Sequence, residues 1–331
     1  MIELNEDNAR RVVADWAGVS LDSLDAVVAW ELTGGVSNSV YRVRIAGRAD
    51  VILKQSLAKL RVKEDWFSDR SRIFNEIDAL RGLGSLAPAG SLPVILFEDR
   101  ANYLFAMSAA DETAPSWKEE LLAGRVDTSL AVQAAELHAT FFHAEQLRNR
   151  FEGLELFDQL RLDPYYRFTA YRHPDLARYF ERAIARCRED RRGLTHGDWS
   201  PKNFLVNTGG RLFSIDYEVM HWGDPGFDAA FLLNHLLLKG WHRSRDRALY
   251  AGAALAYWNR LSELVSGDWL ESATLCHLGC LHLARVDGKS PAEYLRPAEQ
   301  AQARRFARDL IQNAPPTVAE VFKMQAEAFH E

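Results

Sequence analysis

Apolar and polar positions divide the chain into a strand-rich first part and a longer helical part. A helix is predicted over residues 6–18, and from about residue 30 the pattern becomes extended. Apolar and polar residues alternate over 40–45 and a second apolar run covers 51–54, with turn-type residues between them, which predicts a hairpin. The remaining elements predicted here are a helix over 68–82 and strands over 92–97 and 102–107.

Beyond about residue 110 the apolar positions recur every three to four residues, which predicts helices. One hairpin interrupts them, because short apolar runs over 203–206 and 212–215 flank a Gly-Gly turn. The predicted helices cover 117–123, 127–146, 175–190, 227–239, 246–265, 269–284 and 297–312. The pattern therefore predicts an α+β protein with two lobes, residues 1–108 and 109–331, and a hinge near 106–112.

Composition narrows the class of protein. The chain has 331 residues, of which 47% are hydrophobic and 26% charged, as in an ordinary globular protein. A net charge of -6 argues against nucleic acid as the main partner. The most apolar run, 229–238, is about half the length that spans a bilayer, so we expect no membrane partner. Three cysteines form no disulfide framework, and we expect a cytoplasmic location. The sequence predicts no oligomeric state.

The segment from Leu194 to Asn203 carries the most informative chemistry. It reads LTHGDWSPKN and supplies Asp198 and Asn203, and Asp216 comes after the short hairpin. The hairpin would bring these three oxygen-bearing side chains to one edge. Phosphoryl transfer needs a carboxylate that orients the attacking hydroxyl, and hard oxygen ligands that hold Mg²⁺. Either Asp198 or Asn203 alone would equally be typical of a turn.

The ordered set resembles a known family. His196-Gly197-Asp198 with Asn203 is similar to the catalytic loop of the aminoglycoside phosphotransferase and choline kinase superfamily, and Ile215–Glu218 resembles its metal-binding motif. The segment Gly223–Asp228 resembles the stretch that lies just C-terminal to that motif in the family. The resemblance implies a two-lobed protein-kinase-like fold, ATP and Mg²⁺ as cofactors, Asp198 as catalytic base, and Asn203 and Asp216 as metal ligands.

The first lobe fits the same interpretation. Thr33–Tyr41 joins two predicted strands and is glycine-rich, so its backbone amides could approach phosphates closely. Lys54 ends the next strand, and Glu76 in the subsequent helix is its expected partner. We expect nucleotide binding by these residues, by the hinge, and by the loop: Lys54, Glu76, Gly34, Gly35, Ser37, Asn38 and Met107. A surface lysine and a surface glutamate would be the ordinary alternative.

Other nucleotide or metal sites have less support. Asp287–Ser290 ends like a phosphate-binding P-loop, but Leu283 stands where the first glycine should be, and no strand precedes it. No G-x-G-x-x-G comes after a strand. Cys276 and Cys280 could suggest zinc ligation, yet they share one helical face with Leu283, which is more typical of a packed core.

The acceptor of the phosphoryl group is expected to be a small molecule. The chain reads H-G-D where protein kinases have H-R-D, and it lacks their long activation segment and A-P-E. Residues after 240 carry as many acidic as basic side chains, which gives no sign of a pocket for a polycation such as an aminoglycoside. Trp residues leave an aromatic cage for a choline-like substrate open. Candidate substrate contacts are Tyr165, Tyr166, Trp199, Trp222, Arg285 and Asp287.

A further, faint similarity concerns the segment Trp117–Arg125 and the helix after it, which look like methylthioribose kinases. This similarity favours a sugar-like or other neutral polyol acceptor, beside an amino alcohol. Two alternatives stay open: an aminoglycoside-modifying resistance kinase, and a non-catalytic pseudokinase that only binds nucleotide.

Overall fold

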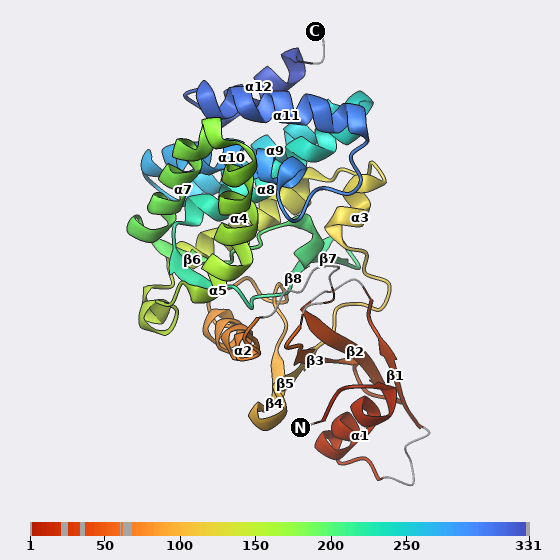
Figure 1. Ribbon diagram of the computed structural model, residues 1–331. Coiled ribbons are helices and arrows are strands. Elements are labelled where there is room, and N and C mark those ends of the chain that lie inside the picture. The colour runs from red at the N-terminus through yellow and green to blue at the C-terminus, as the bar shows by residue number, and fades with distance from the viewer. Residues whose placement is uncertain (1, 21–25, 34–36, 60, 62–67, 329–331) are drawn as a thin grey trace.

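A five-stranded antiparallel sheet forms the N-terminal part of the computed structural model, which describes residues 2–20, 26–33, 37–59, 61 and 68–328. Its strands run in the order β1-β2-β3-β5-β4. Figure 1 shows this sheet and α1 at one end of the molecule and the larger body of helices at the other. The strands are β1 (Val27–Glu31), β2 (Asn38–Ile45), β3 (Val51–Ser56), β4 (Ile95–Asp99) and β5 (Leu104–Ser108).

Two helices cover opposite faces of this sheet. Helix α1 (Glu6–Ala17) begins at the capping residue Asn5 and packs its apolar side in one core cluster with Val51 and Leu53 of β3. Helix α2 (Arg72–Leu83) packs in the main core cluster with Ile52. Because successive strand residues point to opposite faces, Lys54 lies on the same face as Ile52, toward α2.

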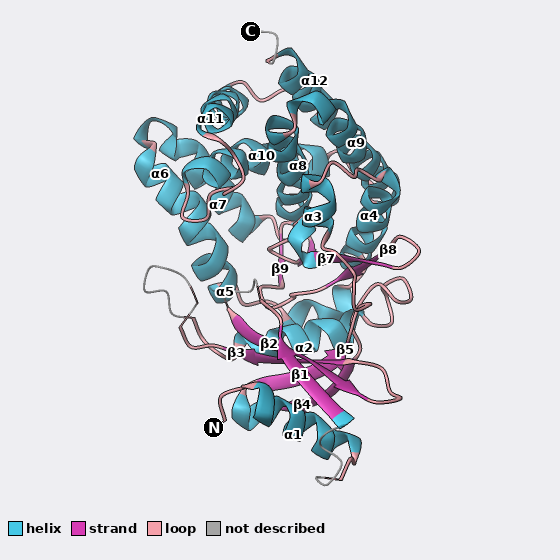
Figure 2. Ribbon diagram, turned by 90° about the vertical axis from the view of Figure 1, so that its right-hand side faces the viewer, coloured by secondary structure: helices cyan, strands magenta, loops and turns pink. Residues whose placement is uncertain are grey.

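The second part is a body of helices arranged around α8, as Figure 2 shows from the side. Helix α8 packs against α9 and α10, α10 against α11, and α4 against α9. The helices are α3 (Trp117–Leu122), α4 (Thr128–Phe142), α5 (Glu155–Phe157), the π-helix η4 (Asp158–Arg167), α6 (Phe168–Arg172), α7 (Ala177–Glu189), α8 (Pro225–His242), α9 (Arg247–Leu264), α10 (Trp269–Asp287), α11 (Pro297–Gln312) and α12 (Val318–Glu327). Short 3₁₀ turns are η2 (Arg100–Asn102), η3 (Glu145–Arg150), η5 (Pro174–Leu176), η6 (Pro201–Asn203) and η7 (Ser244–Asp246).

Two short strand pairs lie where the helical body faces the sheet. Strand β6 (Gly193–Thr195) pairs with β9 (His221–Gly223), and β7 (Phe204–Asn207) pairs with β8 (Arg211–Ser214). The segment between β6 and β7 and the segment between β8 and β9 therefore connect the same two strand pairs. Both segments contain the residues that the sequence selected for catalysis and metal binding.

Most predicted elements are confirmed, with shifts at their ends. The helix predicted over 68–82 begins at Arg72, and the hairpin predicted over 40–54 is formed by β2 and β3. The sequence pattern missed the helical stretch from α5 to α6, which contains Pro164, and the last helix, α12. It also missed the three-residue strands β6 and β9, which are too short to display an alternation.

The expected α+β architecture is confirmed. Strand β5 ends at Ser108, and the predicted domain boundary between 108 and 109 remains a prediction. In the ranges that the structure describes, no helix has the length and apolar character needed to cross a membrane.

Candidate active site between the sheet and the helices

The loop after β6 is fixed by a buried aspartate of α8. Asp228 accepts hydrogen bonds from the backbone N–H groups of His196 and, at 2.9 Å, of Gly197. Burial raises the pKa of Asp228 to about 8, although the two N–H donors act in the opposite direction. Gly197 has a φ of 77°, and an added Cβ would lie 3.0 Å from the Val219 side chain. The loop therefore requires glycine at this position, which explains H-G-D in structural terms.

Asp198 is held by two cations that share one of its oxygens. Arg161 Nη2 lies 2.9 Å from Asp198 Oδ2, and Lys202 Nζ lies 2.8 Å from the same atom. Burial opposes ionisation of Asp198, but Lys202 and Arg161 outweigh it and hold its pKa well below the ordinary value. The carboxylate is thus ionised. The cations occupy Oδ2, and among the described residues no hydrogen bond is donated to Oδ1, which is left to accept a proton or a hydrogen bond.

Hydrogen bonds to backbone carbonyls place Asn203 and Asp216 beside Asp198. Asn203 Nδ2 donates to the Asp198 carbonyl at 2.9 Å, so its amide oxygen is the atom left for a metal. The Ile215 N–H donates to the Asn203 carbonyl at 3.0 Å, which places Asp216 next to the loop. Asp216 has a φ of 71°, a left-handed conformation that aspartate adopts more readily than most residues. The β7–β8 hairpin thus brings the three side chains to one edge.

Lys54 joins the sheet, α2 and the second loop. Its Nζ lies 2.6 Å from Glu76 Oε2 and 2.7 Å from Asp216 Oδ1. Burial opposes the charge on Lys54, but Asp216 and Glu76 outweigh it and raise its pKa. Burial disfavours the charged form of Glu76 more strongly and raises its pKa to about 7 against the pull of Lys54. We therefore assign the stronger ionic partnership to Lys54 and Asp216, whose pKa is lowered.

Glu218 has a different environment from Asp216, although only one residue separates them. Its Oε2 accepts from Asn38 Nδ2 at 3.0 Å and from Arg72 Nε at 3.2 Å. Arg72 is fully buried and also donates to the carbonyls of Ser37, Leu57, Ser68 and Asp69. Asn38, which we expected to contact phosphate, thus ties the start of β2 to the segment after Asp216.

One group of carboxylates could hold a metal ion, although Lys54, Arg72 and Asn38 already contact its members. Carboxylate oxygens of Glu76, Asp216 and Glu218 lie within 4.8 Å of one another, and this is the one such group among the residues described by the structure. Hard oxygen donors of this kind are those that Mg²⁺ prefers. Cys280 belongs to the main core cluster and Cys276 packs against it, in line with their interpretation as packing residues.

The other residues expected to contact nucleotide are not brought together at the site by the described structure. Gly34 and Gly35 lie outside the described residues. Ser37 Oγ accepts from its neighbour Asn38 at 3.0 Å, and Met107 of β5 pairs with Ile52 in the sheet, within the main core cluster. Lys54 and Glu76 are brought together with Asp216, whereas Ser37 and Met107 remain predictions as nucleotide contacts.

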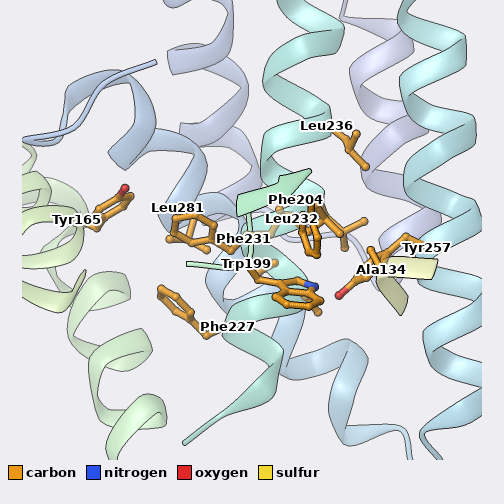
Figure 3. Packing of buried hydrophobic residues seen from close by; sticks show 14 of the residues in the cluster. Ala134, Tyr165, Trp199, Phe204, Phe227, Phe231, Leu232, Leu236, Tyr257 and Leu281 are labelled. Carbon is orange, nitrogen blue, oxygen red and sulfur yellow. The ribbon is translucent and has the colours of Figure 1, made fainter. Parts of the chain in front are cut away.

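Several candidate substrate residues are enclosed by the helical core. Trp199 is fully buried, its ring 5.1 Å from that of Phe141 and 4.6 Å from that of Phe204, and Figure 3 shows it among the core residues. Tyr166 is fully buried and bonded to His277 at 2.9 Å, and Trp222 Nε1 donates to the Arg191 carbonyl at 3.2 Å. Such surroundings are typical of packing residues.

The remaining three substrate candidates lie around the end of α10. Asp287 receives two bonds from Arg304, at 2.7 and 2.8 Å, and one contact of 2.9 Å from His173. Arg285 Nη1 reaches Tyr165 Oη at 3.5 Å. The acceptors of Asp287 are therefore occupied, whereas Tyr165 and Arg285 form a separate pair. The role of all these residues toward a substrate remains a prediction.

Four polar residues at this site were not selected from the sequence: Arg72, Arg161, Lys202 and Asp228. Lys202 stands inside the catalytic-loop motif and Asp228 inside the segment C-terminal to the metal-binding motif, so the sequence contained a signal for both. Arg72 and Arg161 are ordinary surface-type residues in a sequence, and only the tertiary structure reveals their partners. A cavity of about 540 Å³ between α7, α10 and α11 is lined by none of the site residues.

Comparisons with known proteins point in one direction. A curated relative, the methylthioribose kinase of Yersinia pestis (strain Pestoides F), is 28% identical over 254 residues, which cover 67% of this chain and 61% of the relative. The Yersinia pseudotuberculosis enzymes of the same name match equally over 254 residues at 28% identity. The chain therefore spans about 61% of the length of the curated relatives it matches.

Solved structures share the fold at low identity. A choline/ethanolamine kinase family protein from Mesorhizobium loti has a TM-score of 0.54 at 17% identity, over 97% of this chain and 98% of that one. Plasmodium vivax ethanolamine kinase has a TM-score of 0.55 at 12% identity, over 98% and 87%. An aminoglycoside phosphotransferase in ternary complex with ADP and hygromycin B has a TM-score of 0.52 at 15% identity, over 92% and 99%.

These similarities confirm the two-lobed kinase-like fold that the motifs implied. The model of the phosphotransferase enzyme family matches residues 30–264, which is well over half of the chain. That range includes the strands β2 to β5, Lys54, the catalytic-loop motif, Asp216 and the whole of α8. The protein belongs to the phosphotransferase enzyme family.

Proposed function

We propose that this protein is an ATP-dependent kinase that phosphorylates a hydroxyl group of a small molecule. The observation that carries the proposal is the state of Asp198: it is ionised, one oxygen is held by Arg161 and Lys202, and the other remains available. Such a carboxylate can position a hydroxyl and accept its proton.

In the proposed reaction the acceptor oxygen forms a bond to the γ-phosphorus of ATP, and the bond from that phosphorus to the β–γ bridging oxygen breaks. ADP leaves with the electron pair of that bond. The hydroxyl proton passes to Oδ1 of Asp198. Lys202 Nζ is 2.8 Å from Asp198 Oδ2, so its positive charge would also stabilise the negative charge on the phosphoryl group during transfer.

The cofactor residues are assigned from the same geometry. Asn203 and Asp216 would hold Mg²⁺, which when bound neutralises phosphate charge and polarises the γ-phosphoryl group. Lys54, positioned by Glu76 at 2.6 Å, would contact the phosphates of ATP. The nucleotide of the aminoglycoside phosphotransferase complex, ADP, supports an adenine nucleotide as the phosphoryl donor.

The acceptor is proposed to be a small hydroxyl compound, sugar-like or an amino alcohol. The relatives named methylthioribose kinase favour a sugar-like acceptor, and those named ethanolamine kinase favour an amino alcohol. The alternatives of an aminoglycoside-modifying enzyme and of a nucleotide-binding pseudokinase are decided by experiment.

The test is acceptor-dependent release of ADP from purified protein with Mg²⁺ and ATP, and of GDP with GTP, across sugars, sugar acids, amino alcohols and aminoglycosides. We expect at least one small acceptor to be phosphorylated, and Asp198→Asn to lower kcat by about 10³-fold or more while nucleotide affinity is retained. Asp309→Asn, on α11 and away from the site, is the matched control. Nucleotide binding without ADP release from any acceptor would instead identify a pseudokinase.

A further inference from the structure

A buried cationic group lies behind the catalytic loop, on the side of the helical body. Lys239 of α8 is fully buried, and its Nζ donates a long bond of 3.3 Å to the carbonyl of His235, one turn earlier. The same atom lies 5.5 Å from the centre of the Tyr294 ring. Among the described residues no carboxylate lies within 4.0 Å of it. A lysine in such a place is costly unless something supplies a negative charge.

Two neighbouring residues have donors that are only partly paired. Arg285 of α10 is 8% exposed, and its Nη1 donates to Ser290 Oγ at 2.8 Å and to the Ser290 carbonyl. Its buried Nε atom has no hydrogen-bond partner within the described part of the chain, and the same is true of the buried hydroxyl of Tyr294. Buried polar atoms are normally paired, so unpaired ones in one place indicate a missing ligand.

The charges around this group leave it positive. Lys118 of α3 is paired with Glu293 at 2.6 Å, and the Asp287 carboxylate on the same helix as Arg285 is taken by Arg304 and His173. Burial, and after it the charges of Lys118 and Arg285, lower the pKa of Lys239 to about 7, while Glu293 acts in the opposite direction. Glu293, the carboxylate that acts on both Lys239 and Arg285, is already paired with Lys118, so positive charge is in excess here among the described residues.

Two elements connect this group to Asp198. On α8, Asp228 holds the catalytic loop and Lys239 lies eleven residues later, about 16 Å along the helix. His235 lies between them and is within the electrostatic reach of both Lys239 and Asp198. On η4, Arg161 binds Asp198 while Tyr165, one turn on, contacts Arg285.

We propose that Lys239, Arg285 and Tyr294 bind an oxyanion, a carboxylate or phosphate group, carried by the acceptor whose hydroxyl meets Asp198. This inference rests on the proposed kinase function and specifies its acceptor class as a hydroxy acid, a sugar acid or a sugar phosphate. An oxyanion would accept from the two cations and the tyrosine hydroxyl, and it would neutralise the buried charge. A polycationic aminoglycoside or a quaternary amine would be repelled from the same place.

The first experiment compares matched acceptors. ADP release is measured with gluconate against glucitol and with glucose 6-phosphate against glucose, with glucosamine as a cation. We expect a carboxylate or phosphate compound to be preferred about tenfold or more in kcat/KM over its neutral partner. Lys239→Met should abolish that preference by raising KM, and the exposed Lys323→Met should retain it. The two acid series distinguish carboxylate from phosphate.

The second experiment separates binding from folding and from catalysis. Isothermal titration with the same compounds is carried out on wild type, Lys239→Met and Tyr294→Phe, and each melting temperature is recorded. Removing a buried, unbalanced charge or an unpaired hydroxyl should leave the melting temperature equal or higher, while affinity for the acid falls about tenfold or more.

The outcomes are distinguishable. Acids that bind wild type but not Lys239→Met, without ADP release, would support the proposed oxyanion site and contradict the kinase function. ADP release from neutral or cationic acceptors only, with an unchanged KM in Lys239→Met, would support the kinase function and overturn the proposed oxyanion site. Equal binding of every compound to wild type and Lys239→Met would also overturn it.

Discussion

Arg161 Nη2 lies 2.9 Å from Asp198 Oδ2, and the Nε of the same guanidinium donates to the carbonyl of Gly197. One side chain of the π-helix η4 thus fixes both the carboxylate and the loop that presents it. A rigid second layer of this kind is what allows a carboxylate to act at a defined distance from its substrate.

Replacing Arg161 with methionine should shift the acid limb of the pH–rate profile to higher pH. Arg161 and Lys202 hold the pKa of Asp198 below its ordinary value, so removing one cation raises that pKa. The base is active when ionised, so activity then disappears at a higher pH as the solution is acidified. We also expect kcat to fall about tenfold or more at about pH 7.5. The control is Arg167→Met, because Arg167 lies in the same helix but pairs with the partly exposed Asp158. If the acid limbs of wild type and Arg161→Met coincided, the proposed role of Arg161 would be contradicted.

The Lys54–Glu76 pair should behave as a buried ion pair in stability measurements. Both side chains are nearly inaccessible, and Lys54 Nζ is 2.6 Å from Glu76 Oε2. Lys54→Met should destabilise the protein by about 3–5 kcal/mol, because Glu76 and Asp216 then lose the cation that they share. The double variant Lys54→Met/Glu76→Leu should recover part of that loss, the part due to Glu76, while activity stays absent. Urea unfolding measures both, and a double variant less stable than Lys54→Met would refute this account.

The proximity of the candidate site residues could be predicted from the sequence because three of them lie in two short segments around one hairpin. Asp198, Asn203 and Asp216 needed only the pairing of β7 with β8 to meet, and Lys54 and Glu76 needed only strand alternation and the next helix. Local patterns were sufficient for these relationships. The two-lobed α+β fold was predicted from the same patterns.

Long-range partners were beyond such reasoning. Arg161 meets Asp198 from a π-helix that the pattern of apolar residues did not reveal, and Lys239 sits inside α8, where it looks like an exposed end of a helix. Trp199 looked suited to a substrate pocket because it comes directly after Asp198, yet its burial against Phe141 and Phe204 depends on the packing of α4. Tertiary packing decides such positions, and sequence neighbours do not.

Asp228 should make stability depend on pH in a defined direction. Its folded-state pKa of about 8 is above the ordinary value, so the folded protein retains a proton that the unfolded chain loses. Its contribution is therefore most favourable below about pH 4 and declines as the pH rises toward 8. The free energy of unfolding of wild type minus that of Asp228→Asn should fall over this range by at most about 1.4 kcal/mol per pH unit. Urea unfolding from about pH 5 to about pH 8.5 measures the difference, and a constant difference would exclude this titration.

Asp216 and Glu218 should respond differently to the concentration of Mg²⁺. The carboxylate of Glu218 is held by Arg72 and Asn38, whereas Asp216 faces Lys54 at the catalytic edge. We expect Asp216→Asn to raise the Mg²⁺ concentration for half-maximal ADP release about tenfold or more. Glu218→Gln should mainly lower the melting temperature, since it weakens a buried contact. A Mg²⁺ titration of ADP release, in parallel with thermal unfolding, tests this difference between the two variants. The prediction would be wrong if Glu218→Gln changed the Mg²⁺ requirement and left the melting temperature unchanged.

The buried side chain of Arg72 couples the local opening of several segments around the five-stranded sheet. It is bonded at once to Ser37 before β2, to Leu57 after β3, to the entry of α2, and to Glu218. No one of these segments can open without breaking bonds to the others, so their amide hydrogens should exchange with solvent as one cooperative unit with a common opening free energy. Nucleotide bound against any of them would then slow exchange in all of them together.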